Sequence, residues 1–196
     1  MSRTVNDDAL AILFREAHTY SAWEDKPVSP TLLMALYDLV RMGPTAVNAC
    51  PARFVFLTSP EAKARLKPFL SEGNVAKTMS APVTAIIAYD LGFAETLPKL
   101  FPHNLGARDW FNDPSYAEET AFRSGTLQGG YFILAARSLG LDCGPMSGFD
   151  GPGLTQEFFG GISLQANFLC NLGYGKPEGR HPRAPRLSFE EACQIL

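Results

Sequence analysis

The sequence SYAEETAFRSGTLQGGYFILAARSLG, residues 115–140, decides the fold, and LDCGPMSG, residues 141–148, follows it directly. Ser115 stands three positions before Glu118, a capping-box spacing that predicts the start of a helix. Apolar side chains fall on nearly every helical face from 126 to 139, which predicts that the helix is buried. Gly140 is typical of a helix end. The stretch therefore predicts a central helix about 35 Å long, followed by a loop rich in glycine and proline.

Three glycines lie inside this predicted helix, at Gly125, Gly129 and Gly130. A glycine costs a helix about 1 kcal/mol relative to alanine, so a packing reason is expected at these positions. The missing side chains predict that another backbone passes close to the helix. Arg137 lies on the same helix, and we expect it to take no part in ligand binding.

The composition is typical of one globular domain, here residues 1–196. Hydrophobic residues make up 46% of the chain and charged residues 19%, which argues against disorder and coiled coil. The net charge of −3 gives no general attraction to nucleic acid or to anionic membranes. The longest apolar run, around 82–89, is too short to span a bilayer, and the N-terminus lacks a secretory pattern. Four scattered cysteines predict neither a zinc site nor a disulfide framework, so a reducing cytoplasm fits best.

Hydrophobic periodicity and turn residues place the remaining elements. Helices are predicted at 7–18, at 30–40 after the N-cap Ser29, from Ser59 onward, at 155–159 and after Ser188. Strands are predicted at 53–57, 83–89 and 168–172, with the second in the centre of the sheet. Together these elements predict an α+β sandwich, with helices packed around a mixed sheet. Residues 91–114 mix aromatic side chains with prolines and charges, and we expect them to form a lid over a site.

Three common kinds of site are not supported. Residues 144–148, GPMSG, do not form a G-x-S-x-G nucleophile elbow, and they follow a helix instead of a strand. His18, His103 and His181 are far apart in sequence and lack ligand-spaced partners, so no metal site is predicted. No G-x-G-x-x-G motif opens a helix after a strand, so any nicotinamide cofactor is not held by a Rossmann domain.

Four loops carry the remaining binding chemistry: HTYSAW at 18–23, GPTAVNACP at 43–51, CGPMSG at 143–148 and KPEGRHPRAPR at 176–186. Each loop alone is more often a simple turn. In combination they resemble the nitroreductase family of FMN flavoproteins over essentially the whole chain. In that family an arginine- and serine-rich motif near the N-terminus contacts the cofactor phosphate, and a Pro-[Ser/Thr]-x-x-Asn-x-x-Pro loop reaches the isoalloxazine. The core helix ends in a turn beside the ring, and a late basic residue returns to the phosphate.

The resemblance implies FMN as the cofactor and assigns binding roles residue by residue. The N-terminal motif departs from the family pattern, because this chain lacks the two arginines that most members have there. Arg186 is therefore expected to carry more of the phosphate binding. The residues so assigned are His18, Thr19, Tyr20 and Ser21 near the N-terminus, Pro44, Thr45 and Asn48 in the second loop, Pro145, Met146, Ser147 and Gly148 after the core helix, and Arg183 and Arg186 in the tail.

Longer runs are similar to one branch of the family, the malonic semialdehyde reductase (3-hydroxypropionate dehydrogenase) type linked to pyrimidine breakdown. Two of these runs are GPMSGFD at 144–150 and PRLSFEEAC at 185–193. The resemblance implies a mainly antiparallel sheet, a homodimer with FMN near its interface, NADH or NADPH as reductant, and ping-pong hydride transfer through flavin N5.

Two other functions are compatible with the same residues. One is a broad NAD(P)H reductase of nitro compounds or quinones that uses the same site, and the other is a flavin-binding protein without turnover. A site for a short acid aldehyde needs a cation or a set of donors for the carboxylate. Within the lid, His103 and Arg108 are predicted to hold that carboxylate.

Overall fold

The computed structural model describes residues 4–196, so residues 1–3 of the predicted domain lie outside the described residues. Its sheet has the strand order β1-β2-β4-β3, and all neighbours pair in antiparallel fashion. The strands are β1 (Ala52–Leu57), β2 (Val83–Asp90), β3 (Asp142–Met146) and β4 (Leu164–Gly173). The three strands expected from the sequence are confirmed, and β2 and β4 occupy the centre.

The edge strand β3 corrects the prediction of a loop at 143–148. Gly144 and Pro145 are typical of turns, because glycine has no side chain to pack and proline has no N–H to donate. Pro145 is tolerated because β3 is an edge strand of the sheet, and a Cβ at Gly144 would lie 2.6 Å from the carbonyl oxygen of Tyr20, so glycine allows the N-terminal segment to pass. The other side of β3 meets the N-terminal segment through a parallel bridge between Thr19 and Cys143.

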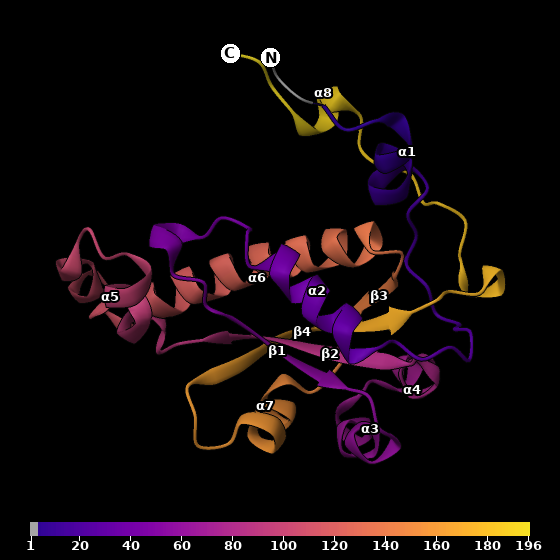
Figure 1. Cartoon of the computed structure of the whole chain (residues 1–196), viewed down its shortest axis with the longest axis horizontal. Coiled ribbons are helices and arrows are strands. Elements are labelled where there is room, and N and C mark those ends of the chain that lie inside the picture. The colour runs from indigo at the N-terminus through magenta and orange to yellow at the C-terminus, as the bar shows by residue number, and fades with distance from the viewer. Residues whose placement is uncertain (1–3) are drawn as a thin grey trace.

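Two layers of helices cover the sheet, as Figure 1 shows. Side chains of β2 alternate between the layers: Ala85 and Ile87 pack in one core cluster, and Ile86 and Ala88 pack in the other. Both faces of β2 are therefore buried, which confirms the expected α+β sandwich. On one face lie α2 (Pro30–Val40) and α6 (Pro114–Ser138), and on the other α3 (Pro60–Leu66), α4 (Glu72–Ser80) and α7 (Gly151–Phe159).

The central helix α6 begins one residue before the predicted start. Its N-cap is Asp113, whose carboxylate accepts a hydrogen bond of 2.9 Å from the main-chain N–H of Ser115, and Pro114 takes the first helical position. The hydroxyl of Ser115 also donates to Asp113, and these bonds lower the pKa of that carboxyl. The predicted helix end is confirmed, because Gly140 has a φ of +77° and the N–H of Leu141 donates to the carbonyl of Ala136.

The three glycines of α6 have different surroundings. A Cβ at Gly129 would overlap the ring of Phe168, and one at Gly125 would lie 2.9 Å from the Cβ of Tyr89. Gly130 faces open space. The close approach predicted from the sequence therefore occurs at two of the three positions: it involves the Phe168 side chain at Gly129, and the Tyr89 side chain with its Cα at 3.8 Å at Gly125.

Two peripheral parts lie at opposite ends of α6 in Figure 1. The arm holds both chain ends and contains α1 (Asp7–Leu10), a π-helical turn (Ala11–Arg15) and α8 (Phe189–Ala192). The lid consists of α5 (Leu97–Leu100) between 3-10 turns at Phe93–Thr96 and Leu105–Phe111. Further 3-10 turns are at Ala46–Asn48, Lys67–Phe69 and Pro177–Gly179.

The lid packs against the end of β2 and the start of α6 in a third core cluster. Phe93 and Leu97 are buried, and the rings of Phe93 and Phe111 meet edge to face with centroids 4.8 Å apart.

Within the described residues, no helix combines the length and apolar character needed to cross a bilayer.

Candidate functional site

The N-terminal segment 18–21 is fixed between β3 and the C-terminal tail. The main-chain N–H of Tyr20 donates to the carbonyl of Cys143 at 3.0 Å, and that of Ser21 donates to Gly179 at 2.9 Å. The Ser21 hydroxyl donates to the same Gly179 carbonyl at 3.1 Å. The structure therefore brings together three segments that the sequence analysis assigned to the cofactor: 18–21, the stretch from β3 to Gly148, and the tail.

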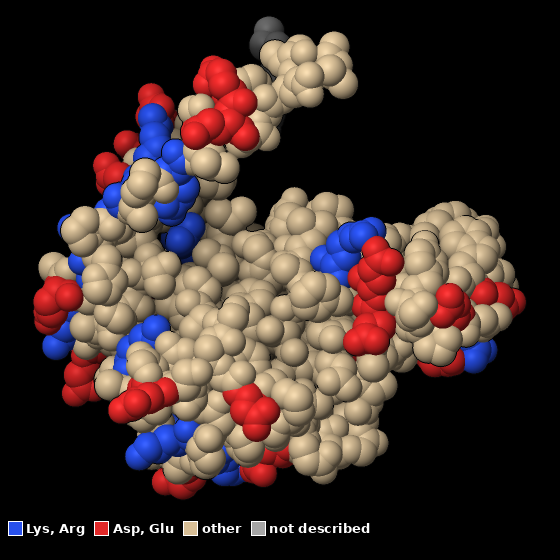
Figure 2. All heavy atoms as spheres, turned by 180° about the vertical axis from the view of Figure 1, so that it is seen from behind, with Lys and Arg blue, Asp and Glu red and all other residues tan. Residues whose placement is uncertain are grey.

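A cavity of about 410 Å³ lies between the arm, residues 18 and 19, the last turn of α6 and the tail, and we call it the basic pocket. Figure 2 shows blue side chains gathered at the base of the arm, on the side of the molecule that carries both chain ends. Among the residues that line the cavity, none is acidic. Its basic and imidazole side chains are His18, Arg137, His181, Arg183 and Arg186.

Main-chain carbonyl groups hold the arginines of the basic pocket. Arg183 donates to the carbonyls of Arg15 at 2.8 Å and Ala17 at 2.7 Å. Arg186 donates to the carbonyl of Ala184 at 2.9 Å. Carbonyl acceptors leave the positive charge of a guanidinium uncompensated, so the pocket suits an anion with several oxygen acceptors, such as a phosphate.

Arg137 lies in the wall of the basic pocket, a position that the sequence analysis did not anticipate. This residue lies in the last turn of α6, is half-buried and lines the basic pocket. Sequence periodicity placed it on a helix that was expected to be wholly buried. The available signal was its place in the last helical turn, beside the point where the chain enters β3. His181 was weighed only as a metal ligand, although it lies in the basic loop 176–186 beside Arg183.

The turn after β3 is held by α4, a contact that the sequence analysis did not anticipate. The carbonyl of Gly148 accepts hydrogen bonds from the main-chain N–H of Ser71 at 3.0 Å and from the Asn74 side chain at 2.7 Å. A Cβ at Gly148 would lie 2.7 Å from the same Asn74 nitrogen, so a larger residue would displace the Asn74 side chain. No hydrogen bond of residues 4–196 has the Gly148 N–H as its donor. The turn therefore offers a main-chain donor to a ligand.

The second predicted loop, 44–51, has a strained backbone. Val47, Asn48 and Cys50 have φ angles of 46°, 53° and 44°. A β-branched residue with positive φ is an outlier, and strain of this kind is concentrated at ligand sites. Thr45 accepts a hydrogen bond of 3.1 Å from the Cys50 N–H, and the Asn48 side chain donates to the carbonyl of Leu100 at 2.8 Å. These contacts join the loop to the lid.

Within one chain, the 44–51 loop does not meet the basic pocket. The N–H of Ala46 donates to the hydroxyl of Ser124 in the first half of α6, whereas Arg137 lies thirteen residues later on that helix. At 1.5 Å per residue the two anchoring points are about 20 Å apart. Pro44, Thr45 and Asn48 therefore lie at the lid end of the molecule, and the other predicted cofactor residues lie at the arm end or near α4.

The predicted substrate residues His103 and Arg108 also lie at the lid end. The Arg108 guanidinium forms an ion pair with Glu95 at 2.6 Å, and both side chains are more than half exposed. The His103 ring packs on Phe101 with centroids 3.8 Å apart. An exposed pair of this kind contributes about 0–1 kcal/mol, so Arg108 can exchange Glu95 for another carboxylate.

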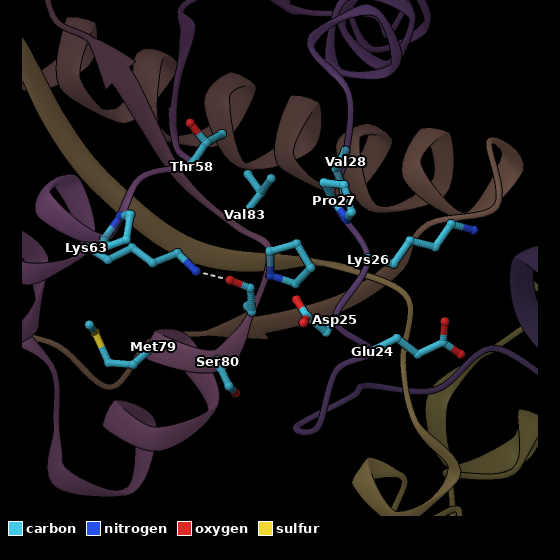
Figure 3. A pocket seen from close by; sticks show the side chains of 13 residues that line it. Glu24, Asp25, Lys26, Pro27, Val28, Thr58, Lys63, Met79, Ser80 and Val83 are labelled. Carbon is cyan, nitrogen blue, oxygen red and sulfur yellow. Dashed lines mark hydrogen bonds between the residues drawn. The ribbon is translucent and has the colours of Figure 1, made fainter.

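Another cavity, of about 550 Å³, lies below the 24–28 segment and contains the side chain of Lys63 (Figure 3). The Lys63 ammonium is buried and donates to the carbonyls of Thr78 and Ala81 at the end of α4. Burial lowers its pKa from 10.5 to about 8. Because its bonds go to carbonyls that a helix end leaves unpaired, Lys63 acts as a C-terminal cap of α4.

Residues at the arm end and in the turn beside α4 fit FMN. The basic pocket suits the phosphate, and the free Gly148 N–H suits an acceptor atom of the ring system. Across residues 4–196, His, Cys, Asp and Glu do not gather in any group of three or more that suits a metal ion.

Comparisons with known proteins show which family the chain belongs to. The Nitroreductase family profile matches residues 15–176. A protein of Stenotrophomonas maltophilia is 60% identical over all of both chains, and one of Burkholderia lata is 58% identical over 98% of each. Both carry the provisional name NADH dehydrogenase/NAD(P)H nitroreductase. A provisional nitroreductase of Exiguobacterium sibiricum, solved in complex with FMN, has a TM-score of 0.85 at 16% identity, with all of both chains covered. The chain therefore belongs to the nitroreductase family.

Proposed function

We propose that this chain is an FMN-dependent oxidoreductase that takes reducing equivalents from NADH or NADPH and reduces malonic semialdehyde to 3-hydroxypropionate. The observation that carries the proposal is the basic pocket, which has three arginines and no acidic side chain among its lining residues. The turn after β3, held by α4, adds a free main-chain donor. The provisional names of the two relatives, which mention NADH and NAD(P)H, support the choice of reductant.

The chain's own residues bind and orient the cofactor. Arg137, Arg183 and Arg186 neutralise the phosphate, and His18 stands beside them. The segment 19–21 and the turn 145–148 run along the ring and the ribityl chain. FMN, when bound, supplies two-electron transfer between a nicotinamide and an acceptor. Asn74 contributes by holding the carbonyl of Gly148, which anchors the turn that carries the Gly148 N–H to α4.

The proposed assembly is a homodimer with two shared sites. Leu127 is 46% exposed and Tyr131 37% exposed, although the sequence predicted a wholly buried helix. Nearby on α2, Met34 and Tyr37 are also exposed, and the surface between the arm and the lid is largely uncharged in Figure 2. A two-fold pairing through these faces buries apolar side chains that water otherwise meets.

Two-fold pairing also resolves the separation of the predicted cofactor residues. The arm end and the lid end are at opposite ends of α6, so an antiparallel pairing of two copies brings each lid to the partner's arm. The 44–51 loop of one copy, with Pro44, Thr45 and Asn48, then reaches the FMN bound by the other. Each chain is proposed to act as one domain in this cytoplasmic dimer.

The choice of a small acid aldehyde rests on the runs GPMSGFD and PRLSFEEAC and on the lid. His103 and Arg108 are proposed to close over the flavin and hold the substrate carboxylate. The second candidate is a broad reductase of nitro compounds or quinones, which the provisional names of the relatives favour.

The test is steady-state NADH oxidation by FMN-loaded protein with malonic semialdehyde, nitrofurazone and a quinone as acceptors. We expect the highest kcat/KM with malonic semialdehyde. We also expect Arg108→Ala to lower that value more than the value for an uncharged aldehyde of similar size. Asp109→Ala, on the same turn, serves as the control variant. Highest activity with nitrofurazone or the quinone contradicts the assignment and supports the broad reductase, and no turnover with any acceptor contradicts both.

A further inference from the structure

A second cationic cavity lies at the lid end, and nothing above gives it a role. Its volume is about 480 Å³, and it is bounded by the end of α2, the 44–51 loop, the start of β1 and α5. We call it the lid cleft. Three cations line it, one from each of three separate elements: Arg41, Arg53 and Lys99. Asn48 lines the same cavity, so the lid cleft is continuous with the strained loop.

The three cations differ in how firmly they are held. Arg53 is fixed, since it pairs with Asp90 at 2.7 Å and donates to the carbonyls of Cys50 and Ala52. Arg41 has a looser partner, Asp38, at 3.3 Å, and both of these side chains are more than half exposed. Lys99 makes no ion pair or side-chain hydrogen bond with any residue in 4–196. Neither Asp38 nor Asp90 lines the lid cleft. The cleft therefore has one fixed cation and two that are able to turn toward a ligand.

The size and charge of the lid cleft favour a ligand with more than one anionic group. A single carboxylate needs one cation and fills a small part of about 480 Å³. Two linked phosphates match several cations placed around one cavity, and arginine binds phosphate oxygens through parallel N–H donors. Asn48 places the lid cleft close to the bound nicotinamide. In the proposed dimer this residue reaches the ring system of the partner's FMN, on which a nicotinamide must stack.

We propose that the lid cleft binds the diphosphate of the nicotinamide dinucleotide, with Lys99 and Arg41 as the residues that favour a dinucleotide donor. This inference rests on the proposed function. In a dinucleotide the diphosphate is joined to the nicotinamide through one ribose. A nicotinamide beside Asn48 therefore places the diphosphate close to the cations that share the cavity with Asn48.

The first test measures binding without turnover. ADP-ribose, which carries the diphosphate but no nicotinamide, is titrated into FMN-loaded protein by calorimetry. Lys99→Met and Arg41→Met should each weaken binding about tenfold, the loss typical of one charge-assisted hydrogen bond. Lys67→Met, an exposed lysine on the opposite helical layer, is the matched control. Equal affinity for ADP-ribose in wild type and both cleft variants overturns the inference.

The second test separates this inference from the proposed function. NADH is compared with 1-benzyl-1,4-dihydronicotinamide, which donates hydride but has no phosphate. We expect the ratio of the two kcat/KM values, NADH over the benzyl compound, to fall about tenfold in Lys99→Met. An unchanged ratio overturns the assignment. Lys99→Met can also lower kcat/KM for malonic semialdehyde while its affinity for ADP-ribose stays that of wild type. In that case the cleft binds the carboxylate of the acceptor, and the donor assignment is wrong. If neither donor supports turnover, the proposed function fails and the calorimetry alone decides the inference.

Discussion

The guanidinium of Arg137, in the last turn of α6, donates a hydrogen bond of 3.1 Å to the main-chain carbonyl of Leu13. This bond joins the central helix to the arm, and it places the Arg137 side chain among the residues of the basic pocket. The neighbouring Asp142 is held by a bond of 2.8 Å from the Gly175 N–H. Burial raises the pKa of Asp142, while this bond and the charge of Arg137 oppose that rise.

The first prediction concerns the phosphate. Arg137→Ala and Arg186→Ala should each weaken FMN binding by about 1.5–3 kcal/mol, the contribution of a hydrogen bond to a charged group. The measurement is titration of apoprotein with FMN, followed by the quenching of flavin fluorescence. Arg123→Ala is the control, because Arg123 lies on the same helix and pairs with Glu119 on the surface. Unchanged affinity in both pocket variants places the phosphate elsewhere.

The second prediction uses two adjacent glycines of α6. Gly129→Ala should lower the free energy of unfolding by about 1–3 kcal/mol, because its methyl group overlaps the Phe168 ring in a packed core. Gly130→Ala should raise it by up to about 1 kcal/mol, since that position faces open space and alanine is the better helix former. Urea unfolding of the two variants checks both signs. A loss of stability in Gly130→Ala would mean that this face is covered, for example by a partner subunit.

The third prediction concerns the dimer. Leu127→Glu places a carboxylate in the middle of the exposed face of α6, where pairing would desolvate it, so it should shift the protein to monomers in sedimentation velocity. It should also weaken FMN binding, because the 44–51 loop then no longer reaches the partner's cofactor. Ile162→Glu, an exposed apolar position in the turn before β4, is the control. A wild-type monomer with FMN bound contradicts the shared site.

The fourth prediction follows from Lys63. Burial lowers its pKa in the folded chain to about 8, below the 10.5 that applies to an exposed lysine. Between these values the unfolded chain keeps a proton that the folded chain has released, so stability rises with pH across that window. From about pH 7.5 to 9.5 the free energy of unfolding should gain about 2 kcal/mol more in wild type than in Lys63→Met. Equal pH dependence of the two proteins would mean that Lys63 stays protonated.

The sequence alone determined most of the framework. The alternation and length of the apolar runs located three of the four strands, and the pairs Ser29-Pro30 and Ser59-Pro60 marked two helix starts that the structure confirms. At both starts the serine hydroxyl accepts a hydrogen bond from the main-chain N–H of the residue three positions later. These signals are local, because a cap or an alternating strand is specified by residues within a few positions of each other.

Tertiary structure alone decided how the candidate site is assembled. The segment 18–21 lies beside Cys143 through a hydrogen bond that joins residues more than a hundred positions apart, and no local pattern encodes that contact. The sequence indicated only that Arg137 lies on a buried helix. Its hydrogen bond to the carbonyl of Leu13 in the arm depends on tertiary structure. Gly144 and Pro145 read as a turn, and they form a strand because β4 supplies the ladder. The burial of α6 was overestimated for the same reason: periodicity records which faces are apolar, whereas packing decides which of them the same chain covers.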